Sequence, residues 1–315
     1  MKLKYLFLII FSVFVLGCTA QLPGLNLPSL GGGGIISGTD VGMEFIDDQP
    51  PSQLENGEQF KVGLDLINKA PYDIDGELCV KSTLSFSGFG STGIPQKTPE
   101  CKDIQIDSGL EPGGSIIPKP LEKIFPNEFE FYSYLNPNPI SQEFTITASL
   151  KYLPVTLANA NVCIKKRGAV SGKIVCNEKE SLSIKQYPAP IKISKIDKSI
   201  TNTGSNLIRM NLNIYLDKVV DGRIMDKDQI FDTSLSKEPR IQIGINLKDV
   251  SANFECTKDG FSDLIFKEKG DNIIKCSATI PVSEGPYVNP MEIVLEYGFN
   301  REISKTINLK ARNIV

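Results

Sequence analysis

Apolar and polar residues alternate along most of this chain, and this period of two limits what the chain can fold into. Every second side chain is apolar from Phe60 to Leu66 and again from Phe144 to Tyr152. The later segments IRMNLNIYL, RIQIGINL and MEIVLEYGF repeat the pattern. Successive side chains of a strand point to opposite faces, so the pattern predicts strands that are half-buried in a sheet. Clusters of Gly, Pro, Asn and Asp separate the segments, and no long segment has a helical period. We therefore expect an all-β fold of antiparallel β-sandwiches.

The length of the chain predicts more than one sandwich. An immunoglobulin-like sandwich has about 100 residues, and the alternating part extends from residue 42 to the end of the chain. The segment QYPAPIKISKI contains two prolines and precedes a new alternating strand, so we place a boundary there. The prediction is two tandem Ig-like domains, at residues 42–187 and 188–315. The strand ends SLKY and VLEY, at Tyr152 and Tyr297, suggest that the two are related.

The N-terminus has the layout of an export signal. Lys2 and Lys4 precede an apolar run from Tyr5 to Leu16, which is shorter than the roughly 20 residues that span a bilayer. Residues 1–17 are therefore predicted to be a signal peptide. Residues 18–41 are rich in Gly and Pro and are predicted to form a flexible tether with a reach of roughly 25 Å. We expect an extracytoplasmic protein.

The residues Val15-Leu16-Gly17-Cys18 resemble the lipobox of prokaryotic lipoproteins. The resemblance implies that the chain is cut before Cys18 and that this cysteine is lipidated, which would anchor the protein to the cell membrane. An ordinary cleaved signal with an incidental cysteine is the alternative.

The stretch FIDDQPPSQLENGEQFKVGLDLINKAPYDIDGEL, at residues 45–78, resembles the front of Ig-like surface domains of the CARDB and archaeal adhesion types. Members of these families bind, space or decorate at the cell surface and do not catalyse. The resemblance implies a prokaryotic surface module of the same kind.

Six cysteines remain when Cys18 is set aside. An even number in an exported chain indicates disulfides, and six cysteines allow 15 connectivities. They fall into three local couples, so we expect Cys79–Cys101, Cys163–Cys176 and Cys256–Cys276. A metal site is the alternative, but the chain has neither a CxxC pair nor a histidine.

Composition excludes several classes of function. The absence of histidine excludes Ser-His-Asp triads, Cys-His nucleophiles and His-ligated metals. Removal of the signal peptide takes away two lysines and no acid, so the formal net charge goes from −3 to −5 and nucleic-acid binding is not expected. GFGSTG matches a phosphate-binding GxGxxG, but prolines follow where that motif needs a helix. We therefore predict no cofactor.

Aromatic residues provide candidate partner contacts in two segments. Phe86 and Phe89 lie in the glycine-rich stretch between Cys79 and Cys101, and a loop folded back over the sandwich is the alternative for them. In NEFEFYSYL, alternation puts Phe131 in the core and Tyr132 and Tyr134 on the solvent face, where tyrosine could meet a partner. Cross-strand packing is the alternative for these tyrosines.

Acidic residues gather in VVDGRIMDKDQIFD. Calcium prefers clustered carboxylate oxygens, so weak candidates for a calcium site are Asp221, Asp226, Asp228 and Asp232. The EF-hand spacing is missing, and a solvated turn is the default interpretation. We predict no metal centre.

Together these patterns predict a membrane-anchored surface lipoprotein that acts as a non-enzymatic binding, adhesion or structural module. Its expected partners are membrane lipid through Cys18 and a protein or polymer at the cell surface. A carboxylate-dependent hydrolase of external polymers and a solute-binding lipoprotein are the alternatives. The lack of alternating strands and helices argues against the latter.

Overall fold

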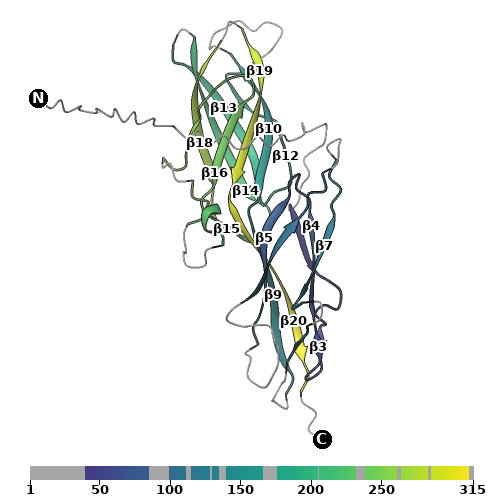
Figure 1. Ribbon diagram of the computed structural model, residues 1–315. Coiled ribbons are helices and arrows are strands. Elements are labelled where there is room, and N and C mark those ends of the chain that lie inside the picture. Colours follow the sequence, from purple (N-terminus) through teal and green to yellow (C-terminus); the bar gives the residue numbers. More distant parts are fainter. Residues whose placement is uncertain are drawn as a thin grey trace, which may run out of the picture.

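The protein is almost entirely β, as the alternation predicts, and it forms two elongated lobes joined end to end (Figure 1). The computed structural model describes residues 40–84, 99–110, 115–127, 130–134, 140–165, 176–204, 206–231, 238–260, 264–282 and 285–311. We name the lobes lower and upper after their places in Figure 1 and call the region between them the waist.

The lower lobe has two main sheets around a shared core. One has the order β1-β4-β7 and the other the order β15-β20-β9-β5-β6, with β2 paired in parallel to β20. A small pair, β3-β8, lies beside them. The strands are β1 (Val41–Phe45), β2 (Gln53–Leu54), β3 (Gln59–Phe60), β4 (Val62–Asn68), β5 (Ile74–Ser82), β6 (Glu100–Ile106), β7 (Pro120–Phe125), β8 (Tyr132–Ser133), β9 (Gln142–Tyr152), β15 (Arg223–Met225) and β20 (Gly298–Leu309).

The upper lobe also has two antiparallel sheets. Their orders are β12-β10-β19-β16 and β11-β13-β14-β18-β17. The strands are β10 (Val155–Ile164), β11 (Lys179–Ser181), β12 (Ile184–Gln186), β13 (Ile191–Asn202), β14 (Leu207–Lys218), β16 (Gln242–Leu247), β17 (Glu255–Thr257), β18 (Asn272–Pro281) and β19 (Tyr287–Glu296). A 3-10 turn, η1 (Lys227–Gln229), follows β15 at the waist.

The period of two explains how the strands pack. Every second residue of β9 from Phe144 to Tyr152 is buried, and β14 alternates in the same way from Ile208 to Leu216. The apolar faces of paired sheets thereby form the cores of the two lobes, while the opposite faces meet solvent. Within the described residues, no helix is long and apolar enough to cross a membrane.

The chain passes the waist between β9 and β10 and returns between β19 and β20. Strand β20 then pairs with β9 along its whole length, from Phe299 opposite Tyr152 to Leu309 opposite Gln142. In the upper lobe, β10 pairs with β19. The sheets therefore do not divide at residue 188 as expected, because β10 and β12 precede this point and β20 follows it. Alternation within one strand carries no information on which distant strand pairs with it. That the chain comprises two domains stays a prediction.

Candidate functional site

A cluster of hydrogen-bonded tyrosines fills the waist. We call Asp40, Tyr72, Tyr152, Thr156 and Tyr297 the waist cluster. The Tyr72 hydroxyl, from the loop between β4 and β5, donates to Val155 O at 2.9 Å and accepts from Val155 N at 2.7 Å. Both backbone groups of the first residue of β10 are thus bound by a lower-lobe side chain.

Tyr152, the last residue of β9, is fully buried beside the start of the described chain. Its hydroxyl donates to Asp40 Oδ1 at 2.8 Å, and the same oxygen accepts from Val41 N at 2.9 Å. Asp40 is also fully buried. A hydrogen bond to a buried carboxylate is worth more than one between neutral groups, so this contact ties the two segments firmly together.

Tyr297 occupies the return crossing between β19 and β20. Its hydroxyl accepts from Ile191 N at 2.9 Å and lies 3.1 Å from Thr156 Oγ1. Thr156 gives its only hydroxyl proton to Ile191 O at 2.7 Å, so the Tyr297 hydroxyl is the donor to Thr156. The start of β13 is thereby bound to both crossings of the waist.

Burial determines the protonation of these tyrosines. Desolvation and then the charge of Asp40 raise the pKa of Tyr72, Tyr152 and Tyr297 well above the ordinary value of 10.0. Neutral hydroxyls both donate and accept, as this network requires. The waist cluster is therefore suited to holding the lobes together.

Three lysines, Lys102, Lys198 and Lys258, are partly or fully withdrawn from solvent. Desolvation is the largest cause that lowers the pKa of each. Lys198 is 2% exposed; its Nζ donates to Cys163 O at 2.7 Å and pairs with Glu180. Lys258 Nζ donates to Asn272 Oδ1 at 2.6 Å, and Lys102 Nζ donates to Ile124 O at 2.7 Å. Since Lys102 is on edge strand β6 and Ile124 on edge strand β7, this contact joins the two lower sheets.

The six described cysteines form three disulfides, with the pairing that their spacing predicts. Cys79 is joined to Cys101, Cys163 to Cys176 and Cys256 to Cys276. Two of the three join residues directly opposite one another on paired strands. Three disulfides indicate an oxidising, extracytoplasmic environment.

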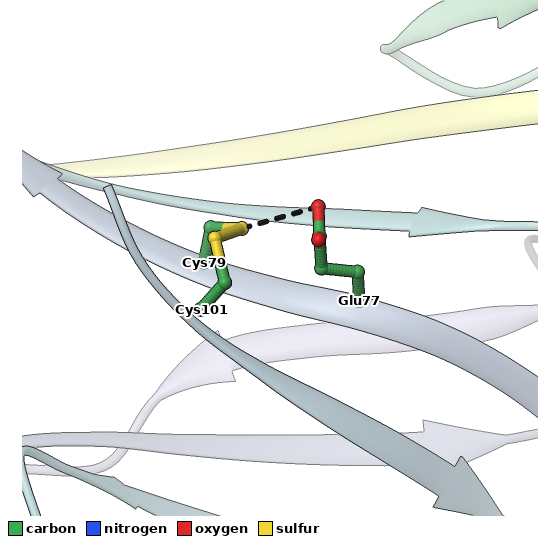
Figure 2. A group of neighbouring side chains, drawn as sticks. All are labelled: Glu77, Cys79 and Cys101. Atoms are coloured by element: carbon green, nitrogen blue, oxygen red, sulfur yellow. Dashed lines mark hydrogen bonds between the residues drawn. A yellow bond between two sulfur atoms is a disulfide. The ribbon is translucent and has the colours of Figure 1, made fainter. Parts of the chain in front are cut away.

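Glu77, Cys79 and Cys101 are the one group of three acidic or cysteine side chains, within the described residues, whose potential metal-ligating atoms lie within 4.8 Å of one another (Figure 2). Both sulfurs belong to a disulfide and have no thiolate to offer a metal. The dashed line in Figure 2 joins Cys79 Sγ to Glu77 Oε1 at 3.5 Å, a contact without a hydrogen atom to share. Glu77 instead pairs with Lys151 at 3.0 Å. This group is structural.

The assignment of faces in NEFEFYSYL is wrong. Tyr132 and Tyr134 are 2% and 3% exposed, whereas Phe131 is 42% exposed. Tyr134 packs edge-on against Phe144 at 4.9 Å, and the Tyr132 hydroxyl donates to Glu100 Oε2 at 2.6 Å. Desolvation, followed by this bond, raises the pKa of Tyr132. In a short strand next to a turn, either set of alternate side chains can face the core. The tyrosine rings can fill the core because their hydroxyl groups form hydrogen bonds there.

The acidic segment holds the turn after β15 together. Asp226 is buried and caps η1, where its Oδ1 accepts from Asp228 N at 3.0 Å. The described carboxylates of Asp221, Asp226 and Asp228 do not form a group of ligand atoms within 4.8 Å. Asp232 lies outside the described residues. Capping of η1 thus accounts for Asp226, one of the four calcium candidates.

Other predicted features also lie outside the described residues. These are Cys18 with the signal and tether, Phe86 and Phe89, and the GxGxxG segment from Gly88 to Gly93.

A shallow groove opens at the waist, with a volume of about 460 Å³. It is lined by Asp75, Gly76, Asp103, Ile104, Gln105, Leu153 and Phe231. Sequence reasoning missed both this groove and the waist cluster. The tyrosines that end SLKY and VLEY were the available signal, because Tyr152 is the last residue of β9 and Tyr297 directly follows β19, at the two crossings.

Comparisons with known proteins assign no family. No protein-family model matches the chain, and no curated protein matches it significantly.

Proposed function

We propose that this protein is a lipid-anchored module of the cell surface that binds, spaces or assembles and does not catalyse. One observation carries the proposal: six of the seven cysteines are joined to one another. Cys18 is left over, and it stands where the lipobox-like sequence ends. Its position next to an apolar run suits lipidation, and two or more acyl chains give a stable membrane anchor.

The waist supports a mechanical role. An adhesion or spacer module must hold its shape under load, and a joint with two chain crossings and several buried hydrogen bonds resists bending better than one linker. Asp40, where the described chain begins, belongs to this joint. The predicted tether therefore meets the protein at its middle, which would keep the distal ends of both lobes available to partners.

The proposal is tested by mass spectrometry of the mature N-terminus, isolated from the membrane fraction of the native host. We expect the chain to begin at Cys18 and to carry acyl groups, and Cys18→Ser to abolish the modification. An unmodified N-terminus, or cleavage at another residue, would refute the anchor.

A hydrolase is the second candidate because the waist groove contains two carboxylates, those of Asp75 and Asp103. Glycosidases use such pairs, with the acid kept protonated by burial. Both side chains are exposed here, which favours binding over catalysis. Turnover of surface polysaccharides that is lost in Asp75→Asn and Asp103→Asn would reverse this preference.

A further inference from the structure

The waist groove exposes two large apolar side chains to solvent. Leu153, which follows β9, is 42% exposed, and Phe231, which follows η1, is 50% exposed. Both line the same groove, although 78 positions separate them in the chain. Scattered apolar side chains on a surface need no explanation, but apolar side chains gathered in one hollow indicate a contact site.

The floor of the groove is fixed by the backbone. Gly76 lies on β5 opposite Tyr152 of β9, and a Cβ at this position would meet Lys151 O at 2.6 Å. Ile104, its partner on β6, is 5% exposed. A side chain at position 76 has no room, so β5 approaches β9 closely at this point of the groove lining.

The rim of the groove is negative. Asp75 and Asp103 are exposed on neighbouring strands, and Glu77 lies directly opposite Asp103. Glu77 is paired with Lys151, which leaves the net charge of the rim at about two negative charges. An occupant that complements this groove carries an apolar group with a cation beside it.

The chain carries such a feature at another place. Lys61 Nζ lies 4.6 Å from the ring centroid of Phe131, and this ring is 42% exposed. Among the four lysine–aromatic pairs of the described residues, the other rings belong to Phe125, Phe266 and Tyr215, and all are less exposed. We call Lys61 and Phe131 the knob.

The knob is too far from the groove of its own chain to fill it. Lys61 follows β3 and Phe131 precedes β8, two strands that pack near Phe144 through Phe60 and Tyr134. Phe144 and the waist residue Tyr152 are eight positions apart on β9, which is about 26 Å along a strand. Figure 1 accordingly places β3 in the part of the lower lobe that is remote from the upper lobe.

We propose that the knob of one copy docks into the waist groove of a second copy, with Phe131 between Leu153 and Phe231 and with Lys61 facing Asp103. The two surfaces differ, so the contact is heterologous, and its repetition produces open chains of molecules rather than closed dimers. Mature chains repel one another through their net negative charge, and the opposite charges of knob and groove give the contact its register. This inference goes beyond the proposed function. Its failure would leave the lipid anchor and a binding role intact.

The test is site-specific photo-crosslinking of the full chain in its native membrane. The residue Phe231 is replaced by p-benzoylphenylalanine, which keeps an aromatic ring in the groove. We expect a crosslinked homodimer in which the photo-residue is attached to the peptide that contains Phe131. The absence of a homodimer, attachment to another part of the second copy, or attachment to a different protein would each overturn the proposal.

Charge reversal provides the matched control. Asp103→Lys in the photo-reactive copy should lower the homodimer yield about fivefold or more, the effect of losing an attraction of about 1 kcal/mol. Asp249→Lys, an exposed carboxylate that does not line the groove, should leave the yield unchanged. A differently tagged Lys61→Asp copy should restore crosslinking to the Asp103→Lys copy. Restoration also demonstrates that both variants fold; equal yields in all combinations would contradict the assigned charge pair.

Discussion

The Tyr152 hydroxyl donates a hydrogen bond to Asp40 Oδ1 at 2.8 Å, and both residues are fully buried at the waist of the molecule. The ring of Tyr152 also packs edge-on against Phe299, at a centroid distance of 5.9 Å, on the strand that returns from the upper lobe. Tyr152, at the end of the outgoing strand β9, thus contacts both the start of the described chain and the beginning of the returning strand β20.

Replacing Tyr152 by Phe removes the donor to the buried carboxylate but keeps the ring. We expect Tyr152→Phe to lower the free energy of unfolding by about 2 kcal/mol, since hydrogen bonds to charged groups contribute about 1.5–3 kcal/mol. Urea unfolding followed by circular dichroism measures this. Tyr287→Phe, at the partly exposed start of β19, is the control and should change stability little. Equal effects in the two variants would contradict the role of the Asp40 contact.

Alkaline pH should destabilise the protein through the buried tyrosines. The pKa of Tyr72, Tyr152 and Tyr297 is raised in the folded state, so above pH 10.0 the unfolded chain loses protons that the folded chain keeps. Each tyrosine then lowers the free energy of unfolding by up to about 1.4 kcal/mol per pH unit. Its stabilising contribution is complete below pH 10.0 and decreases as pH rises toward the folded pKa.

The three lysines whose pKa is lowered, Lys102, Lys198 and Lys258, act in the opposite direction just below this pH range. A lowered folded pKa means that the unfolded chain binds more protons below pH 10.5, so stability rises with pH there. Urea melts at pH 8, 9, 10 and 11 for the wild type and for Tyr72→Phe separate the two effects. The variant should lose stability less steeply above pH 10. An unchanged slope would show that Tyr72 ionises in the folded protein.

Lys198 should be needed for the stability of the upper lobe. Lys198→Met removes the ammonium that binds Cys163 O and Glu180, which leaves a buried carbonyl and a partly buried carboxylate without this donor. We expect a loss of about 2–3 kcal/mol. The control is Lys195→Met on the same strand, whose exposed pair with Asp197 is screened by water and should have no detectable effect. Thermal unfolding of both variants gives the comparison.

Gly222 should tolerate no side chain. It has φ +144°, and a Cβ there would lie 2.4 Å from Phe299 Cζ and 2.7 Å from Asn300 O. Gly260 also has a positive φ, of +84°, but nothing lies within 4 Å of its Cβ position. Gly222→Ala should therefore destabilise the protein by about 1–3 kcal/mol more than Gly260→Ala. Equal losses of stability in the two variants would show that the positive φ alone is responsible and that the neighbours of Gly222 move aside at little cost.

Long local patterns predicted the features that depend on neighbouring residues. The alternation from Phe144 to Tyr152 predicts a half-buried strand, and the spacing of Cys256 and Cys276 predicts a local disulfide, because both follow from residues close in the chain. The pairing of β20 with β9 could not be predicted, since the partners Leu309 and Gln142 are far apart in the chain and the strands of the upper lobe lie between them in sequence. The prediction that Tyr132 and Tyr134 face solvent was wrong because the short strand β8 has too few residues to define a buried and an exposed face. The burial of Lys198 also could not be predicted, because the acceptors that compensate its ammonium, Cys163 O and Glu180, come from strands β10 and β11.

The waist couples the two lobes into one cooperative unit, and pulsed hydrogen exchange across a urea series measures this coupling most directly. Peptides from β5 and β9 report on the lower lobe, and peptides from β14 and β18 report on the upper lobe. We predict that all four strands lose protection at the same urea concentration, because the crossings at Tyr152 and Tyr297 couple the lobes. Loss of protection in one lobe at a clearly lower urea concentration than in the other would contradict the claim.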